Sequence, residues 1–101
     1  MLYEIRFVAG AVADLKALDP SLQKLAWKQT EKVAEVPELG KPLGKKMGSD
    51  LSGFRTIRFY RHVYRVVYEI LEAEGVVKIW GIGKRESEEI YRAVARRREG
   101  I

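Results

Sequence analysis

Three strand-like segments lie close together in the second half of the chain. Aromatic and β-branched residues, which favour strands, dominate residues 54–60, 64–71 and 76–82. Only residues 61–63 and 72–75 separate them. Connections this short join antiparallel neighbours, because a parallel pair needs a crossover of a dozen or more residues. We therefore expect a three-stranded antiparallel meander.

Hydrophobic spacing predicts the other elements. Loose alternation of apolar and charged residues over residues 2–8 indicates a first strand. Apolar residues at helical spacing indicate helices over residues 11–18 and 21–36, and the break at Pro20 between them predicts a helical hairpin. Residues 86–98 predict a C-terminal helix with basic residues at its end, where cations suit the helix dipole.

The predicted fold class is α+β: an N-terminal strand, an α-helical hairpin, a three-stranded antiparallel meander and a C-terminal helix with Ser87 near its start. A chain of 101 residues has room for one hydrophobic core, so we expect a single domain over residues 1–101. The first strand adds at an edge of the meander or beside its last strand, and the hairpin helices cover one face of the sheet.

The net charge of +5 comes from one part of the chain. Residues 1–40 carry 5 basic and 6 acidic side chains, residues 41–65 carry 7 and 1, and residues 66–101 carry 7 and 7. The excess lies in the glycine-rich loop predicted over residues 38–53 and in the first two meander strands. A local excess of this kind favours an anionic partner, such as nucleic acid, an acidic protein or an anionic membrane.

Several classes of site are excluded by residue counts. The chain has no cysteine and one histidine, which excludes disulfides, thiolate catalysis and histidine-cluster metal sites. We expect no metal and no cofactor. No apolar run approaches 18 residues, and the first residues lack the pattern of a secretion signal. A cytoplasmic protein that does not span a membrane is therefore expected.

The period of two along a strand places arginines on one face of the meander. In the first strand Ile57 and Phe59 share a face, and Thr56 and Arg58 lie on the other. If the apolar faces of the first two strands coincide, Arg65 shares the uncovered face with Arg58. Such a face suits phosphate binding. A solvated face with cross-strand ion pairs is the alternative.

Two motifs within this pattern carry a resemblance to a known family. Residues 64–70 read Tyr-Arg-Val-Val-Tyr-Glu-Ile, and residues 81–91 read Gly-Ile-Gly-Lys-Arg-Glu-Ser-Glu-Glu-Ile-Tyr. With the predicted order of elements, they resemble the RelE/ParE toxin superfamily of toxin–antitoxin systems, and the second motif resembles the RelE branch. This resemblance implies a ribosome-dependent endoribonuclease that cuts messenger RNA in the ribosomal A site and is silenced by an acidic antitoxin.

The resemblance also implies the site residues. Arg65, Arg85 and Tyr91 match family positions with catalytic roles, and Arg58 stands where the family has the second of two lysines. The first of those lysines aligns with Thr56, which is a departure from the family pattern. The cations expected to bind RNA nearby are Lys45, Lys46, Arg55, Arg61 and Lys84.

The chemistry sets limits on these roles. Attack by the RNA 2′-hydroxyl needs a base, charge stabilisation on the phosphorane and an acid for the leaving 5′ oxygen. Arginine suits the second task, because its planar fork binds two phosphate oxygens, but it is a poor proton donor. Tyr91 serves as base or acid only if neighbouring arginines lower its pKa, and it could equally stack on a nucleobase.

Simpler interpretations apply to other residues. We interpret His62 as a turn residue, Trp27 and Trp80 as core or rim residues, and the run Arg96–Arg98 as a solvated helix end, with ribosomal RNA contact as its alternative. Two other functions stay open: a ParE-like gyrase inhibitor that cuts no RNA, and a catalytically degenerate member that only binds antitoxin. The expected partners are the acidic antitoxin, the ribosome with A-site messenger RNA, and operator DNA bound by a toxin–antitoxin hetero-oligomer.

Overall fold

The computed structural model describes residues 2–46, 49–86 and 89–100. Its elements in chain order are β1 (Glu4–Phe7), α1 (Ala9–Lys16), α2 (Pro20–Glu35), the 3-10 turn η1 (Pro37–Leu39), β2 (Lys41–Pro42), β3 (Lys45–Lys46), β4 (Ser49–Asp50), β5 (Phe54–Phe59), β6 (Tyr64–Leu71), the 3-10 turn η2 (Glu72–Glu74), β7 (Val76–Lys84) and α3 (Glu89–Arg98). Ser87, predicted near the start of the last helix, lies outside the described residues. The predicted α+β order of elements is confirmed.

The main sheet has the strand order β1-β7-β6-β5-β2. Strands β5, β6 and β7 form the predicted antiparallel meander. Strand β1 lies beside the last strand, β7, in parallel orientation, with Glu4 opposite Val76 and Phe7 opposite Ile79. The predicted loop over residues 38–53 holds more order than expected: β2 pairs with β5, and β3 with β4 forms a separate short hairpin.

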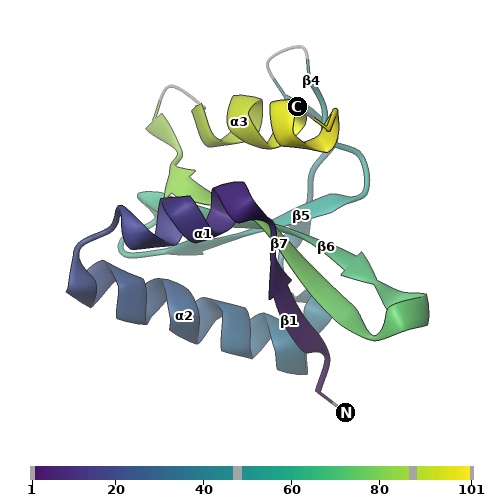
Figure 1. Cartoon of the computed structure of the whole chain (residues 1–101), viewed down its shortest axis with the longest axis horizontal. Helices are drawn as coiled ribbons and strands as arrows, with labels where there is room; N and C mark the ends of the chain where they lie inside the picture. Colours follow the sequence, from purple (N-terminus) through teal and green to yellow (C-terminus); the bar gives the residue numbers. More distant parts are fainter. Residues whose placement is uncertain (1, 47–48, 87–88, 101) are drawn as a thin grey trace.

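The helices α1 and α2 cover one face of the sheet, as predicted (Figure 1). The core on this face takes Phe59 from β5, Val66 and Tyr68 from β6, and Ile79 from β7. These side chains alternate along their strands with residues of the opposite face, so the strand period sorts the core as expected. Within the described ranges, no helix combines the length and apolarity needed to cross a membrane.

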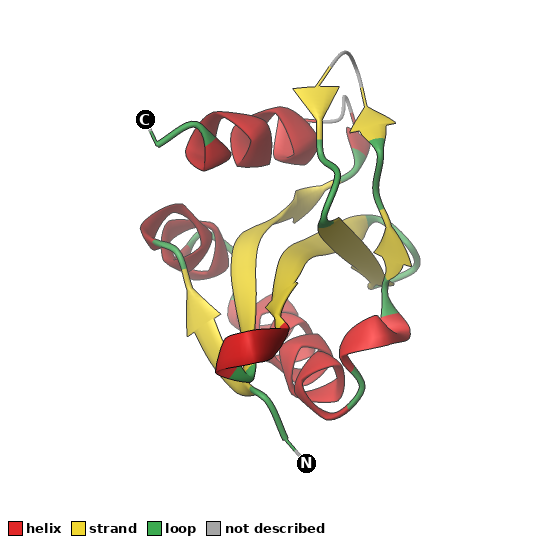
Figure 2. Cartoon of the chain, turned by 90° about the vertical axis from the view of Figure 1, so that its right-hand side faces the viewer, coloured by secondary structure: helices red, strands yellow, loops and turns green. Residues whose placement is uncertain are grey.

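The opposite face is not uncovered, and this part of the prediction is wrong. Helix α3 lies over it beside β4 (Figures 1 and 2). A second apolar cluster fills the space between them, made of Leu43, Leu51, Phe54, Val67, Ile90, Tyr91 and Val94. The close approach of α3 depends on Gly81, where a Cβ atom would lie 2.7 Å from side-chain atoms of both Ile90 and Val94. Arg58 and Arg65 keep their predicted face, but α3 borders the space that they face.

The end of α3 is also anchored, against the expectation of a solvated helix end. The Arg97 guanidinium donates two hydrogen bonds to the carboxylate of Asp14 in α1. The Arg98 guanidinium carbon lies 4.5 Å from the ring centre of Phe54. The arginine run therefore ties α3 to the rest of the molecule through at least two of its three members, while Arg96 is exposed.

Candidate functional site

A groove of about 750 Å³ brings together the four residues predicted to be catalytic. Arg58, Arg65, Arg85 and Tyr91 all line it. The remaining lining residues come from α2, from the segment between η1 and β5, from β5 itself and from the β5–β6 turn: Gln29, Lys32, Leu39, Gly40, Lys41, Pro42, Leu43, Thr56, Ile57 and His62. Among the described residues, five lining side chains are lysine or arginine and none is acidic.

Arg58 and Arg65 are directly opposite each other in the pairing of β5 with β6. The predicted sharing of one sheet face is therefore confirmed, since opposite residues of an antiparallel pair project to the same side. Two like charges at opposite positions are unfavourable without an anion between them. The pair is asymmetric, because Arg58 is exposed whereas Arg65 is only 7% exposed.

Backbone carbonyls of the β5–β6 turn and of the first residue of β6 hold the Arg65 side chain. Its Nη1 donates to the His62 carbonyl at 2.5 Å and to the Tyr64 carbonyl at 3.3 Å. Burial lowers the pKa of Arg65 below its ordinary value, the charges of Arg85 and Arg58 add to this effect, and Tyr91 opposes it. Arginine remains charged at neutral pH even so. The groove thus contains a fixed and partly desolvated positive charge.

The β5–β6 turn that supplies the His62 carbonyl has an unusual backbone. Tyr60, Arg61 and His62 have φ angles of 50°, 55° and 67°, so three consecutive non-glycine residues are left-handed. Such residues are uncommon and strained, and they persist where the surrounding structure holds them. The prediction that His62 is a turn residue is confirmed. That it also lines the groove was not foreseen.

Arg85 and Tyr91 reach the groove from segments that follow the meander in the chain: Arg85 comes directly after β7, and Tyr91 is in α3. The Arg85 amide donates to the Val63 carbonyl at 3.0 Å, which ties the end of β7 to the β5–β6 turn. Tyr91 is only 4% exposed on the sheet-facing side of α3, and it lines the groove together with Arg65. Residues from three separate segments therefore converge on Arg65.

Thr56 lies in the wall of the groove with its hydroxyl turned away from solvent. Its Oγ1 is buried and has no hydrogen-bond partner among the described residues. A buried hydroxyl without a partner is unfavourable unless water or a ligand satisfies it. Thr56 lines the same groove as the arginines. The position where the family has a lysine thus holds a hydroxyl that is buried in the wall of the groove.

The residues predicted to bind RNA are distributed differently. Arg55 does not line the groove: it lies on the helix-covered side and donates to the carbonyls of Gly40 at 2.7 Å and Glu38 at 3.3 Å. Lys84 lines a second pocket, Arg61 lies exposed at the β5–β6 turn, and Lys45 lies exposed in β3. The backbone of Lys46 is in β3, but its side chain lies outside the described residues.

Two groove cations were missed by sequence reasoning. Lys32 comes from α2 and Lys41 from β2. Lys32 is the last member of a stripe of lysines along one face of α2, at positions 24, 28 and 32. The spacing shows that these lysines share a face, but it does not show what that face borders. Lys41 belongs to the basic loop, and only its pairing with Thr56 of β5 brings it to the groove.

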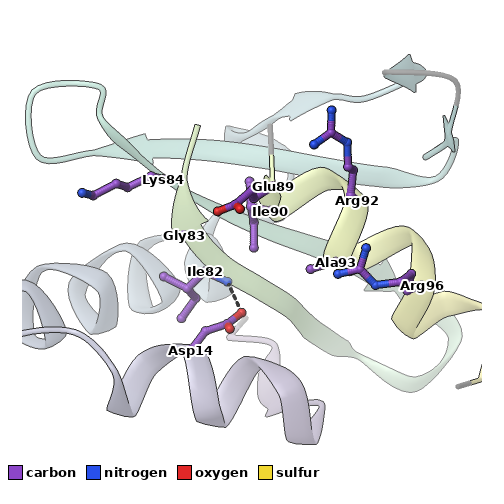
Figure 3. Close-up of a pocket in the computed structure, with 9 residues that line it drawn as sticks. All are labelled: Asp14, Ile82, Gly83, Lys84, Glu89, Ile90, Arg92, Ala93 and Arg96. Atoms are coloured by element: carbon purple, nitrogen blue, oxygen red, sulfur yellow. Dashed lines mark hydrogen bonds between the residues drawn. The ribbon is translucent and has the colours of Figure 1, made fainter. Parts of the chain in front are cut away.

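A second, smaller pocket of about 430 Å³ lies between α1, β7 and α3. Figure 3 shows Lys84, Arg92 and Arg96 around it, together with the carboxylates of Asp14 and Glu89. Its charges are mixed, unlike those of the groove. Across the described residues, no group of three or more histidine, cysteine or acidic side chains is placed to hold a metal ion.

Trp27 and Trp80 lie at the rims of the two apolar clusters. Trp27 is 44% exposed and stacks on Phe7 with ring centres 5.8 Å apart. Trp80 is half-buried and packs against Phe54 at 5.4 Å. The interpretation of both as core or rim residues is confirmed.

Comparison with known proteins places this architecture in a family. The family model for the ParE toxin of type II toxin–antitoxin systems matches residues 5–89. A RelE-like toxin protein of Escherichia coli is 24% identical over 97 residues, which is 96% of this chain and 98% of the relative.

Solved structures give the same result. A mutant of the Escherichia coli toxin RelE in the free state superposes with a TM-score of 0.78 at 25% identity, over 96% of this chain and 98% of that one. The toxin–antitoxin complex RelBE2 of Mycobacterium tuberculosis gives a TM-score of 0.70 at 27% identity, over 84% of this chain and 100% of the other. The chain belongs to the RelE/ParE superfamily of toxins from type II toxin–antitoxin systems.

Proposed function

We propose that this toxin is a metal-independent, ribosome-dependent endoribonuclease that cuts messenger RNA and so inhibits translation. One observation carries the proposal: Arg58, Arg65, Arg85 and Tyr91 line a single groove whose described lining contains no acidic side chain. A groove of this charge attracts a polyanion and offers several donors to one phosphate. The likeness to RelE structures, one of them at 25% identity, supports the same choice.

The arginines act as the electrostatic part of the site. The RNA 2′-hydroxyl attacks the adjacent phosphorus, negative charge grows on the phosphorane oxygens, and the 5′ oxygen leaves. Arg65 is fixed by backbone carbonyls, so its positive charge needs no rearrangement during the reaction. Arg58 and Arg85 supply further donors at the groove.

Tyr91 is the candidate for proton transfer or base stacking. It lines the same groove as the fixed Arg65 guanidinium, so its hydroxyl and its ring are both available to an RNA bound there. Placement of the RNA by the ribosome contributes to the rate by orienting the 2′-hydroxyl for attack. The RNA-binding roles proposed for the exposed Lys45, Arg61 and Lys84 are peripheral, because none of them lines the groove.

The proposal includes partners and location. Solved relatives include RelE in complex with the antitoxin RelB, and we propose an acidic antitoxin that covers the basic groove of this chain. The proposal extends to the ribosome with A-site messenger RNA, to a toxin–antitoxin hetero-oligomer on operator DNA, and to a cytoplasmic location.

The test is translation of a defined message with purified ribosomes and the purified toxin, followed by primer extension. We expect cuts within the A-site codon, and we expect Arg85→Ala and Tyr91→Ala to slow them by about 100-fold or more, the usual cost of losing one such group. Lys24→Ala is the matched control, because it removes one exposed charge outside the groove. Equal cutting by all variants would remove the site assignment.

A second candidate is gyrase inhibition without RNA cleavage, favoured by the ParE family model that matches residues 5–89. It predicts induction of the DNA-damage response and trapped gyrase cleavage complexes while transcripts stay intact. A catalytically degenerate member, suggested by Thr56 in place of lysine, predicts harmless overexpression of a folded product. Expression of the toxin in cells without antitoxin, followed by primer extension of transcripts and detection of gyrase cleavage complexes, separates all three outcomes.

A further inference from the structure

We propose that Asp14 and Arg97 form a latch that holds α3 against β7 and thereby positions Tyr91 beside Arg65. Asp14 and Arg97 are then positioning residues, since neither lines the groove. The catalytic part of this inference rests on the proposed function. The structural part stands on the contacts of the two side chains alone.

The two side chains meet in a fork. Arg97 Nη1 lies 2.8 Å from Asp14 Oδ2, and Arg97 Nη2 lies 3.1 Å from Asp14 Oδ1. The side chains are 23% and 20% exposed, so the pair is largely withdrawn from solvent. Two parallel charge-assisted bonds of this kind fix direction as well as distance.

Both members of the latch also bind the backbone of β7. Arg97 Nη1 donates to the Trp80 carbonyl at 2.9 Å. The Ile82 amide donates to Asp14 Oδ2 at 3.0 Å, as Figure 3 shows. Strand β1 stops pairing with β7 at Ile79, so this edge of β7 has no strand neighbour beyond that point among the described residues. The ion pair takes the place of a neighbouring strand there.

The chain leaves room for this pair at two glycines. A Cβ atom on Gly10 of α1 would lie 2.3 Å from Arg97 Nε, and one on Gly81 of β7 would lie 3.1 Å from Arg97 Nη1. Gly10 lies in the first turn of α1, and the Arg97 side chain passes over it.

Helix α3 needs such a tether. It has 10 residues, and isolated helices of that length are marginal in water. Its buried residues are Ile90, Tyr91 and Val94, all in its first two turns. Arg97 fixes the last turn, so the latch limits rotation and lifting of the helix that carries Tyr91.

The absence of cysteine from the chain allows a direct test. Val94→Cys places a single thiol on the buried side of α3, and Val33→Cys places one in the core between the sheet and the helices α1 and α2. Both positions are 0% exposed. The rate at which a chromogenic disulfide reagent labels the thiol then reports opening of the structure around it. Opening of α3 alone exposes position 94, whereas global unfolding exposes both positions. Each probe is measured alone and with Arg97→Ala, Asp14→Asn or the control Arg96→Ala, an exposed arginine of the same helix.

We expect Arg97→Ala and Asp14→Asn to raise labelling at position 94 by about tenfold or more, as the loss of charge-assisted bonds predicts, with much less effect at position 33. Arg96→Ala should change neither rate. An unchanged rate at position 94, or equal increases at both positions, would overturn the latch.

Positioning of Tyr91 is tested with the single variants. On programmed ribosomes Arg97→Ala should lower the maximal cleavage rate by about tenfold while the half-saturating ribosome concentration stays unchanged, and Arg97→Lys should restore part of the rate. In nuclear magnetic resonance spectra, contacts between the Tyr91 ring and the Arg65 side chain should weaken in Arg97→Ala and persist in Arg96→Ala. Retention of those contacts would refute the positioning role, even if the wild-type protein proved to cut no RNA.

Discussion

Tyr68 ties the segment that leads into the groove to the centre of the sheet. Its side chain is 0% exposed, its hydroxyl donates to the Pro37 carbonyl at 2.6 Å, and it accepts from the Gly40 amide at 2.8 Å. Both partners lie between the end of α2 and β2, which brings Lys41 to the groove. Tyr68→Phe keeps the ring and removes both bonds.

The cost follows from the two bonds and their burial. A net contribution of about 0.5–1.5 kcal/mol each gives about 1–3 kcal/mol, and the buried Gly40 amide left without a partner places the loss near the upper end. We therefore expect Tyr68→Phe to lower the free energy of unfolding by about 2–3 kcal/mol. For a chain of 101 residues, this corresponds to a fall of about 10 °C or more in Tm.

Urea unfolding followed by circular dichroism measures this loss. With an m-value of about 1–1.5 kcal/mol/M, the midpoint should fall by about 2 M with no change in m. Tyr64→Phe is the control, because Tyr64 is on the same strand and face and its hydroxyl makes no hydrogen bond within the described structure. A loss below about 0.5 kcal/mol for Tyr68→Phe, or equal losses for both variants, would refute the reasoning.

Three further outcomes are expected. Gly81→Ala should cost about 1–3 kcal/mol in urea unfolding, because its Cβ would lie 2.7 Å from two side chains of α3; a neutral effect would contradict the packing described. Burial raises the pKa of Tyr68, so its contribution to stability is present below about pH 10 and is lost as pH rises further. The stability gap between wild type and Tyr68→Phe should therefore narrow in that range, and a constant gap would argue against it. Thr56→Lys should raise the rate of RNA cleavage, measured by primer extension, because it restores a cation beside Arg58. An unchanged cleavage rate would show that position 56 takes no part in the reaction.

The strand period was sufficient for the central part of the site. It placed Arg58 and Arg65 on one face before any pairing was known, and the observed register makes them direct neighbours. Short turns fixed the antiparallel order of the meander for the same local reason. These are properties of adjacent segments, which sequence spacing records well.

Contacts between distant segments were not readable in this way. The apolar residues Phe54 and Val67 face α3, yet their spacing alone does not say which element covers them. Gly81 belongs to the motif over residues 81–91, but its role in admitting α3 depends on the packing of Ile90 and Val94 against β7, which the motif does not encode.

Charge was the least specific signal at the level of single residues. Arg55 and Arg97 were grouped with cations expected to face RNA or solvent, but both are used inside the molecule to bind backbone carbonyls. Lys32 belongs to a stripe of lysines along one face of α2, and the sequence does not show that this face borders the groove. An arginine near a chain's own unsatisfied carbonyls and one near a ligand have the same sequence signature.

The pairing of β1 with β7 has a consequence for the order in which the toxin is made. Strand β1 cannot pair until β7 has been synthesised, since Glu4 pairs with Val76 and Phe7 with Ile79. Pairing of segments so far apart in the sequence slows folding, because the chain between them must be ordered first. Arg85 and Tyr91 follow β7. A nascent chain that stops before β7 therefore has neither a complete sheet nor a complete groove, and the groove can form only after β7 and α3 have been made.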